Sequence, residues 1–346
     1  MSPLQQALGL AHPIMQAPMA GGPSTPALVA SVSAAGGLGS FGSAYEDADT
    51  IRRNAAAVRT ITSKPFAINL FLDPGRAPSA FELARTQAIL RPMRAMFGLN
   101  GEAEPSPGPD FAAQLAAVMD ARPAVFSSTF GAPDHEMVRD ARARGILVMG
   151  TATNVEEAEI LISRGVDAIF AQGAEGGGHR GTFASQTEDG LVGVLALTGM
   201  IAALSKVPVV AAGGLMNGAA VKAVLAAGAE LAALGTAFLL CPEAGTSAPY
   251  RAVLKSERAG RTTLTRAFSG RWARGIANEF TRLTAGVSGE LAPFPALNGM
   301  TQDLRRAAAA VGNPEYLSLW AGQGARLARE MPAAQLVSTL VEEMAR

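Results

Sequence analysis

The chain contains few of the residues that build disulfide frameworks, metal centres or nucleic-acid sites. Its 346 residues include a single cysteine, Cys241, which excludes an internal disulfide and is predicted to be a small core residue. Three histidines, His12, His135 and His179, are scattered without metal-ligand spacing, so we predict no metal site. Lys plus Arg and Asp plus Glu each number 29, which leaves no net positive charge to attract a nucleic-acid backbone.

Long uncharged apolar runs are also absent. No window approaches the roughly 18 apolar residues that span a membrane, and the first residues show no basic region followed by an apolar core. We therefore expect a cytoplasmic protein with no membrane partner. Hydrophobic residues nevertheless make up 49% of the chain, which fits a fold with many strands buried on both faces.

Short apolar runs alternate with amphipathic stretches along the chain, a pattern typical of βα units around a parallel sheet. Eight runs predict strands, at residues 13–17, 37–42, 65–71, 123–127, 146–150, 167–172, 208–212 and 231–235. Eight such repeats over roughly 240 residues favour an α/β fold of the (β/α)8 TIM-barrel type. A doubly wound open sheet is the alternative.

Two segments interrupt this rhythm. Residues 73–110 follow the third predicted strand and contain a helical pattern at 81–97, and residues 243–314 follow the eighth strand. Both begin at the carboxyl ends of strands, where barrel active sites form. We predict that they form a smaller, mainly helical lid domain over the site. Residues 1–72 and 111–242, with C-terminal helices within 315–346 (at 315–329 and 333–344), would form the barrel.

The sixth predicted strand ends in a glycine run that carries a histidine. Residues 171–181 read Ala-Gln-Gly-Ala-Glu-Gly-Gly-Gly-His-Arg-Gly. Glycines lack Cβ atoms, so the backbone can approach a flat or phosphorylated ligand closely. His179 directly follows this run, and an imidazole suits proton transfer because its pKa is ordinarily near neutral. A flexible turn with a surface histidine is the alternative interpretation.

Glycines also follow the seventh and eighth predicted strands, where barrels commonly bind phosphate groups. Gly213 and Gly214 offer backbone N–H donors. Gly235 and Thr236 add further N–H donors and a hydroxyl. These positions predict an anion site formed by backbone dipoles, with a plain barrel that has tight turns as the alternative.

Polar and apolar residues at other strand ends suit a planar heterocycle. Asn69 and Gln172 carry carboxamides, which both donate and accept hydrogen bonds, as the edge of a flavin pyrimidine ring requires. Pro18 and Met19, after the first strand, would supply a rigid apolar wall. Each of these residues alone has a purely structural alternative.

Six stretches together resemble the FMN-dependent nitronate monooxygenases, formerly called 2-nitropropane dioxygenases. They are Pro13-Ile-Met-Gln-Ala-Pro-Met, Phe66-Ala-Ile-Asn-Leu-Phe, residues 171–181, Val209-Val-Ala-Ala-Gly-Gly, Gly235-Thr-Ala-Phe and Trp320-Ala-Gly-Gln-Gly. The resemblance covers nearly the whole chain, and His-Arg-Gly is its most specific part. It implies oxidation of alkyl nitronates by O2 to a carbonyl compound and nitrite.

The resemblance also implies FMN as cofactor and His179 as the active-site histidine. The FMN-binding residues that it implies are Asn69, Gln172, Gly177, Gly214, Ala233, Leu234, Gly235 and Thr236. To these we add Pro18, Met19, Gly178 and Gly213 from their positions at strand ends. In our hypothesis, His179 removes the α-proton of a neutral nitroalkane and, once protonated, holds the anionic nitronate.

The chain departs from the family pattern in its second insertion. Family members have tyrosines and a lysine where this chain has Phe294, Asn298 and Gln302. Asn298 and Gln302 are four residues apart, so on a helix they would share a face and line one substrate pocket. Loss of hydroxyls and of a cation would alter how a charged substrate is bound. The sequence therefore specifies the cofactor more closely than the substrate.

Two other functions stay open. One is an FMN-dependent NAD(P)H:quinone or enoyl reductase on the same barrel, and the other is a non-catalytic barrel that binds a phosphorylated ligand. Rapid flavin reduction by NADH or NADPH would indicate the first, and purification without flavin would indicate the second. A small-molecule nitronate and O2 are the expected partners, and a homo-oligomer is an open alternative.

Overall fold

Eight parallel strands form the central sheet of the protein. The structure is a computed structural model and describes residues 1–73, 75–184, 190–204 and 206–346. The strand order is β1-β9-β8-β6-β5-β4-β3-β2. The strands are β1 (Ile14–Gln16), β2 (Gly39–Gly42), β3 (Phe66–Phe71), β4 (Val125–Thr129), β5 (Leu147–Ala152), β6 (Ala168–Gln172), β8 (Val209–Ala212) and β9 (Leu231–Leu234). All eight predicted strands are confirmed.

The first and last strands of this order also meet. Met15 of β1 forms a parallel bridge with Leu38, and the Gln16 amide donates to the Leu38 carbonyl at 2.9 Å. The sheet is therefore a nearly closed, TIM-like barrel, and the doubly wound alternative is wrong. Met15, Met149 and Val210 belong to one buried cluster of strand residues, which also includes Leu4 of helix α1 (Pro3–Ala7).

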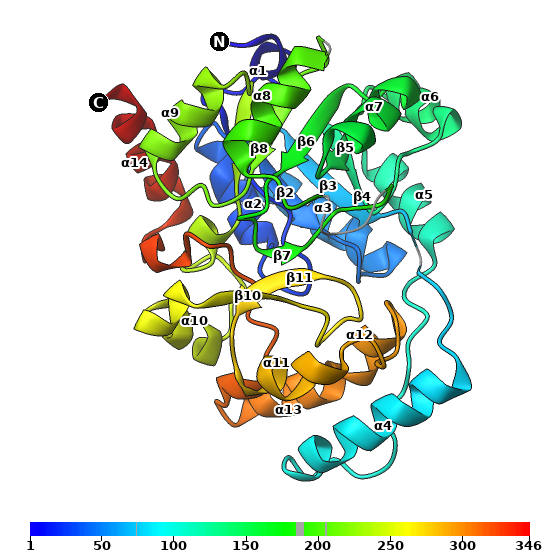
Figure 1. Ribbon diagram of the computed structural model, residues 1–346. Helices are drawn as coiled ribbons and strands as arrows, with labels where there is room; N and C mark the ends of the chain where they lie inside the picture. The colour runs from blue at the N-terminus through cyan, green and yellow to red at the C-terminus, as the bar shows by residue number, and fades with distance from the viewer. Residues whose placement is uncertain (74, 185–189, 205) are drawn as a thin grey trace.

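Helices surround the barrel and bury its outer face (Figure 1). They are α2 (Pro26–Ala34), α3 (Ala48–Ile61), α5 (Phe111–Ala121), α6 (His135–Ala143), α7 (Val155–Arg164), α8 (Val194–Leu204), α9 (Gly218–Ala226) and α14 (Ala333–Ala345). Several begin at side-chain caps that the sequence contains. Asn154 accepts from the Glu157 amide at 2.9 Å, and Asn217 accepts from Ala220 at 2.9 Å, which satisfies N–H groups that lack helical partners.

The two insertions pack together on one side of the barrel. Figure 1 shows α4 and α10 to α13 on the same lower side, with strands β7, β10 and β11 above them. These elements are α4 (Ala80–Ala95), α10 (Ala248–Leu254), α11 (Glu279–Thr284), α12 (Ala296–Met300), α13 (Gln302–Ala310), β7 (Gly178–His179), β10 (Thr262–Thr265) and β11 (Ala273–Ile276). A separate buried cluster joins Leu90 of α4 to Leu304 of α13. Phe268 and Phe280 stack within it, with ring centroids 4.5 Å apart.

The prediction of helices across residues 315–329 is wrong. Only two three-residue 3-10 turns occur there, at Pro314–Tyr316 and Ala325–Leu327. The backbone between them bonds to other segments: the Leu319 carbonyl accepts from Ile276 at 2.8 Å, and the Gln323 amide donates to Glu175 at 2.9 Å. A Cβ on Gly322 would lie 2.7 Å from the Glu175 carbonyl, so this close approach requires a glycine. The prediction for 333–344 is confirmed by α14.

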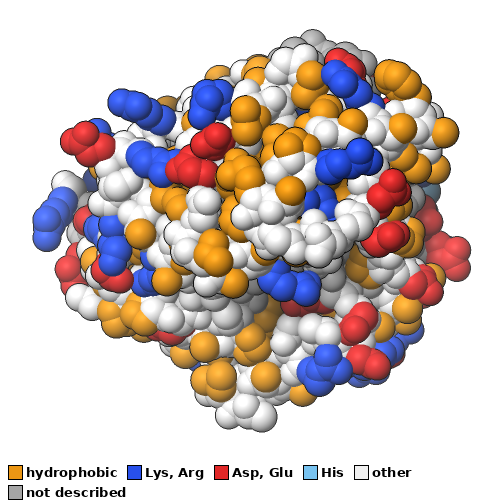
Figure 2. All heavy atoms as spheres, turned by 90° about the horizontal axis from the view of Figure 1, so that it is seen from below, with side chains coloured by type: hydrophobic (Ala, Val, Ile, Leu, Met, Phe, Trp, Pro, Cys, Tyr) orange, Lys and Arg blue, Asp and Glu red, His pale blue; other side chains and the backbone are white. Residues whose placement is uncertain are grey.

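The face formed by the insertions carries charges of both signs. Figure 2 views the molecule from that side and shows Lys and Arg side chains intermixed with Asp and Glu. This distribution agrees with the balanced composition and provides no broad field of one sign on that face. Within the described part of the chain, no helix combines the length and apolar character needed to cross a membrane.

Candidate active site

A cavity of about 480 Å³ lies where the carboxyl ends of the barrel strands face the insertions. Its size is in the range of small-molecule and cofactor sites. It brings together most residues that the sequence analysis selected. Lining residues from that prediction are Pro18, Met19, Asn69, Gln172, Gly177, Gly178, His179, Gly213, Gly214, Ala233, Gly235, Thr236, Asn298 and Gln302.

Two of the selected residues lie elsewhere. Leu234 is 1% exposed and packs into the cluster between the barrel and its outer helices. It faces away from Ala233 because successive side chains of a strand point to opposite faces. Phe294 is buried beside His179, with ring centroids 6.1 Å apart, and is not among the residues that line the cavity.

His179 is positioned by a strand pairing that joins the barrel to the second insertion. Gly178 and His179 form β7, which pairs antiparallel with Ala273 and Arg274 of β11. Aromatic rings enclose the imidazole on several sides. Their centroids lie 5.6–6.1 Å from it and belong to Phe71, Phe130, Phe294 and Trp320.

One member of this aromatic group has an unusual backbone. Phe130 has φ of 66°, a left-handed conformation that is uncommon for a bulky side chain. Arg271 lies over its ring at 3.7 Å and pairs with Asp73 at 2.7 Å. Such strain persists only where surrounding contacts impose it, and here it holds the ring against His179.

The environment of His179 keeps its imidazole neutral. Burial lowers its pKa to about 3, and the positive charges of Arg271 and Arg305 act in the same direction. Nε2 lies 2.8 Å from Oγ of Ser269, a residue of the second insertion. The expectation of a pKa near neutral, made from the residue type alone, is therefore wrong for the structure described.

Arg180 of the His-Arg-Gly motif does not line the cavity. Its side chain is 1% exposed, and the guanidinium donates to the carbonyls of Gln172 at 3.0 Å, Gly173 at 2.7 Å and Gly190 at 2.8 Å. Burial lowers its pKa to about 10, still well above neutral. Arg180 thus fixes the loop that carries His179.

A family model described as nitronate monooxygenase matches residues 2–343. The chain belongs to the nitronate monooxygenase family. A nitronate monooxygenase of Pseudomonas aeruginosa is 45% identical to it over 351 residues, with 97% of each chain covered. One of Paraburkholderia phytofirmans is 43% identical over 346 residues, covering 97% of this chain and 93% of that protein.

A solved structure leads to the same family-level conclusion. A nitroalkane oxidase from Streptomyces ansochromogenes has a TM-score of 0.92 and 40% identity to this chain. The match covers 99% of this chain and 98% of that one. The resemblance noted in the sequence is confirmed, and the chain is an oxidoreductase of the flavin-dependent nitronate monooxygenase family.

Backbone N–H groups after β8 and β9 are free to bind an anionic group. Among the described residues, the amides of Gly213, Gly214, Gly235 and Thr236 have no protein hydrogen-bond acceptor, although all four residues line the cavity. Gly213 and Gly214 have φ of 131° and 68°, which glycine adopts at little cost. This arrangement fits a cofactor phosphate held by backbone N–H groups.

The carboxamides of Asn69 and Gln172 differ in which atoms remain free to bind a ligand. Asn69 donates through Nδ2 to Ser127 at 3.0 Å and Thr129 at 3.2 Å, so its oxygen is the atom left for a ligand. Gln172 donates to the His179 carbonyl at 2.9 Å and accepts from Gly181 at 2.8 Å. Gln172 therefore also stabilises the loop that carries His179.

The sequence analysis missed several residues of the site. Tyr45 and Arg305 line the cavity, and Ser269 contacts His179. Tyr45 follows β2 closely, so a search of every strand end would have found it. Arg305 and Ser269 carry no such signal, because neither follows a barrel strand and only tertiary packing brings them to the barrel.

Proposed function

We propose that this chain binds FMN and oxidises alkyl nitronates with O2 to a carbonyl compound and nitrite. The observation that carries the proposal is the position of His179. It lies on the wall of a single cavity that also contains the free amides after β8 and β9, in a chain related to nitronate monooxygenases over nearly its full length.

The residues that would hold FMN divide into two groups. Gly213, Gly214, Gly235 and Thr236 would bind its phosphate, and Asn69 would accept from the ring system. When bound, FMN would take electrons from the nitronate and deliver them to O2. Gly177 lines the same cavity, and the lack of a Cβ lets its backbone pack closely against Ala321 and Gly322.

His179 would act as a neutral base. If Nε2–H donates to Ser269 Oγ, which can itself donate to the Arg271 carbonyl at 3.2 Å, the lone pair is on Nδ1. Nδ1 would then accept the α-proton of a neutral nitroalkane. An adjacent nitronate would raise the pKa of the resulting imidazolium, because opposite charges favour the charged form.

The insertions would form the lid of this site. Asn298 of α12 and Gln302 of α13 line the cavity opposite barrel residues such as Asn69. We propose that residues 73–110 and 243–314 act as this lid on a barrel of 1–72, 111–242 and the C-terminal part. Leu317 and Leu319 pack into the same buried cluster as the insertions, so the lid would also include the segment around them.

Oxygen consumption by the purified holoenzyme tests the proposal. Ethyl nitronate should support O2 uptake and nitrite release, whereas NADH with a quinone should support neither. His179→Asn should keep flavin bound and abolish turnover of neutral nitroethane. Flavin bleaching by NADH without nitronate turnover would instead indicate the reductase alternative, and a protein that neither retains nor takes up flavin would indicate the binding barrel.

A further inference from the structure

One end of the cavity holds a tyrosine whose hydroxyl has no partner. Tyr45 lines the cavity, and its hydroxyl oxygen is buried with no hydrogen-bond acceptor or donor among the described residues. Its ring packs edge-on against Phe71, with centroids 5.8 Å apart. A buried hydroxyl that is left unpaired destabilises the protein, and a hydrogen-bond partner supplied by a ligand would remove that penalty.

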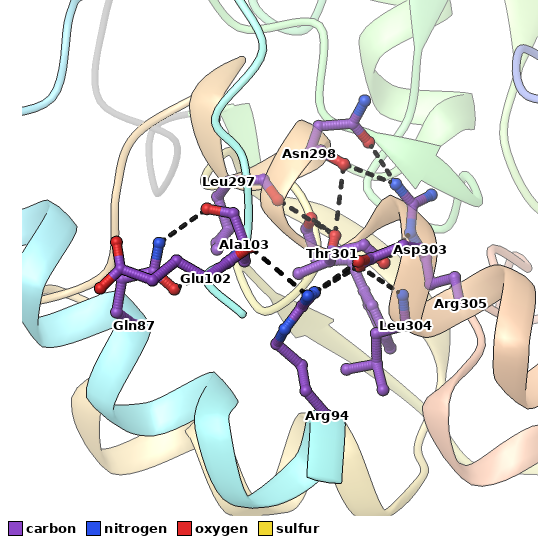
Figure 3. Close-up of polar contacts among 11 residues, drawn as sticks. Gln87, Arg94, Glu102, Ala103, Leu297, Asn298, Thr301, Asp303, Leu304 and Arg305 are labelled. Carbon is purple, nitrogen blue, oxygen red and sulfur yellow. Dashed lines mark hydrogen bonds and ion pairs between the residues drawn. The ribbon is translucent and has the colours of Figure 1, made fainter. Parts of the chain in front are cut away.

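A guanidinium lines the same cavity, near enough for its charge to act on this hydroxyl. Burial raises the pKa of Tyr45, and the charge of Arg305 opposes that rise. Arg305 donates through Nη2 to the Asn298 carbonyl at 2.7 Å and to its side-chain oxygen at 3.0 Å (Figure 3). Its Nε contacts the Thr301 carbonyl at 3.3 Å. Nη1 has no partner in the described part of the chain.

The helix that carries Arg305 is anchored to the first insertion. Arg94 of α4 is 4% exposed and contacts both carboxylate oxygens of Asp303 at 2.6 Å (Figure 3). Thr301, at the junction of α12 and α13, donates to the Phe268 carbonyl at 2.7 Å. These contacts hold Arg305 in place before a substrate arrives, which lowers the entropy cost of binding.

The helix that carries Arg305 presents a second polar group to the cavity. Gln302 and Arg305 both line the cavity, and both belong to α13. Residues three apart share a helix face, so the cation of Arg305 lies on the same side of the helix as the Gln302 carboxamide. Tyr45 of the barrel supplies a hydroxyl, which neither Phe294 nor Asn298 can provide.

We infer that Tyr45 and Arg305 form an oxyanion subsite that determines substrate specificity. Arg305 Nη1 and the Tyr45 hydroxyl donate to an oxygen of the substrate, either of its nitronate group or of a carboxylate substituent. The inference rests on the proposed function for the identity of the substrate. It assigns a permanent positive charge beside the anion to Arg305, whereas His179 carries a charge only after it has accepted a proton.

Two variants test the subsite. Tyr45→Phe removes a hydroxyl that has no hydrogen-bond partner among the described residues, so the fold should be unaffected. It should raise KM about three- to tenfold, as expected for one hydrogen bond. Arg305→Gln should raise KM about tenfold or more, because the lost hydrogen bond is charge-assisted. Arg282→Gln, an exposed residue of α11, is the matched control for loss of a positive charge and should leave KM unchanged.

Two substrates distinguish whether the bound oxygen belongs to the nitronate group or to a carboxylate substituent. One is ethyl nitronate, and the other is a three-carbon nitronate with a terminal carboxylate. If KM rises equally for both, the subsite holds the nitronate group. If it rises only for the second, the subsite holds the carboxylate. KM within about twofold of wild type for both substrates, in both variants, would overturn the subsite.

A binding measurement keeps this inference separate from the proposed function. Calorimetric titration of the oxidised holoenzyme with propionate needs no turnover. The Kd should rise in Tyr45→Phe and Arg305→Gln and stay unchanged in Arg282→Gln. Should the wild type fail to oxidise any nitronate, the proposed function fails while the titration still decides the subsite. An equal Kd in all four proteins would contradict the subsite.

Discussion

Nε2 of His179 and Oγ of Ser269 lie 2.8 Å apart, across the boundary between the barrel and the second insertion. Ser269 is itself held by the backbone of Arg271, through contacts of 3.2 and 3.3 Å. The hydroxyl therefore has a fixed position, and the imidazole is oriented by a residue about 90 positions later in the chain.

Ser269→Ala should reduce kcat about tenfold and leave flavin content unchanged, because it releases the imidazole from one orienting hydrogen bond. Ser269→Thr, which retains a hydroxyl, should recover much of the loss. Initial rates with neutral nitroethane measure the effect, with exposed Ser163→Ala as control. A normal rate in Ser269→Ala would show that packing alone orients His179.

The pKa of His179 predicts how stability depends on pH. In the folded chain the pKa is lowered from 6.5 to about 3, so between these values the unfolded chain binds a proton that the folded chain does not. This contribution lowers the free energy of unfolding as pH falls below about 6.5, and it is absent above that pH.

His179→Asn should therefore lose stability less steeply than the wild type between pH 6.5 and pH 4. Urea unfolding at several pH values gives the two slopes. His135→Asn, at an exposed helix position, controls for removal of an imidazole. Parallel slopes in wild type and His179→Asn would contradict the buried neutral state.

Gly177→Ala should destabilise the fold and lower flavin retention. The added Cβ would lie 2.5 Å from backbone atoms of Ala321 and Gly322, which cannot yield as a flexible side chain would. Overpacking of this kind costs roughly 1–3 kcal/mol. Thermal unfolding and the ratio of flavin to protein absorbance measure both effects. Gly286→Ala, which meets no atom within 4 Å, should change neither.

Replacing either residue of the Arg94–Asp303 ion pair should destabilise the fold, but by unequal amounts. Asp303→Asn leaves the charge of Arg94 buried and unpaired, which should cost about 3 kcal/mol of unfolding free energy. Arg94→Met leaves Asp303, whose side chain is 45% exposed, able to be hydrated, so the loss should be less than half as large. Urea titration of both variants measures the difference. Equal losses would mean that the buried charge is not the source of the cost.

The amino-acid sequence by itself determined the barrel and one half of the site. Eight apolar runs separated by capped helical stretches specify strands buried on both faces, because hydrophobic periodicity and caps are local properties. The glycines after β8 and β9 and His179 after β6 also follow from strand order. In a parallel barrel all strand ends with the same direction meet on one face.

The other half of the site depended on tertiary structure alone. Arg305 reaches the cavity, and Ser269 reaches His179, only because α4 and the second insertion pack together, and no short-range pattern encodes those contacts. Residues 317–324 illustrate the same limit, since their backbone pairs with Ile276 and Glu175 in place of forming a helix. The pKa of His179 follows from desolvation by Phe71, Phe130 and other distant residues, which is a property of the assembled site.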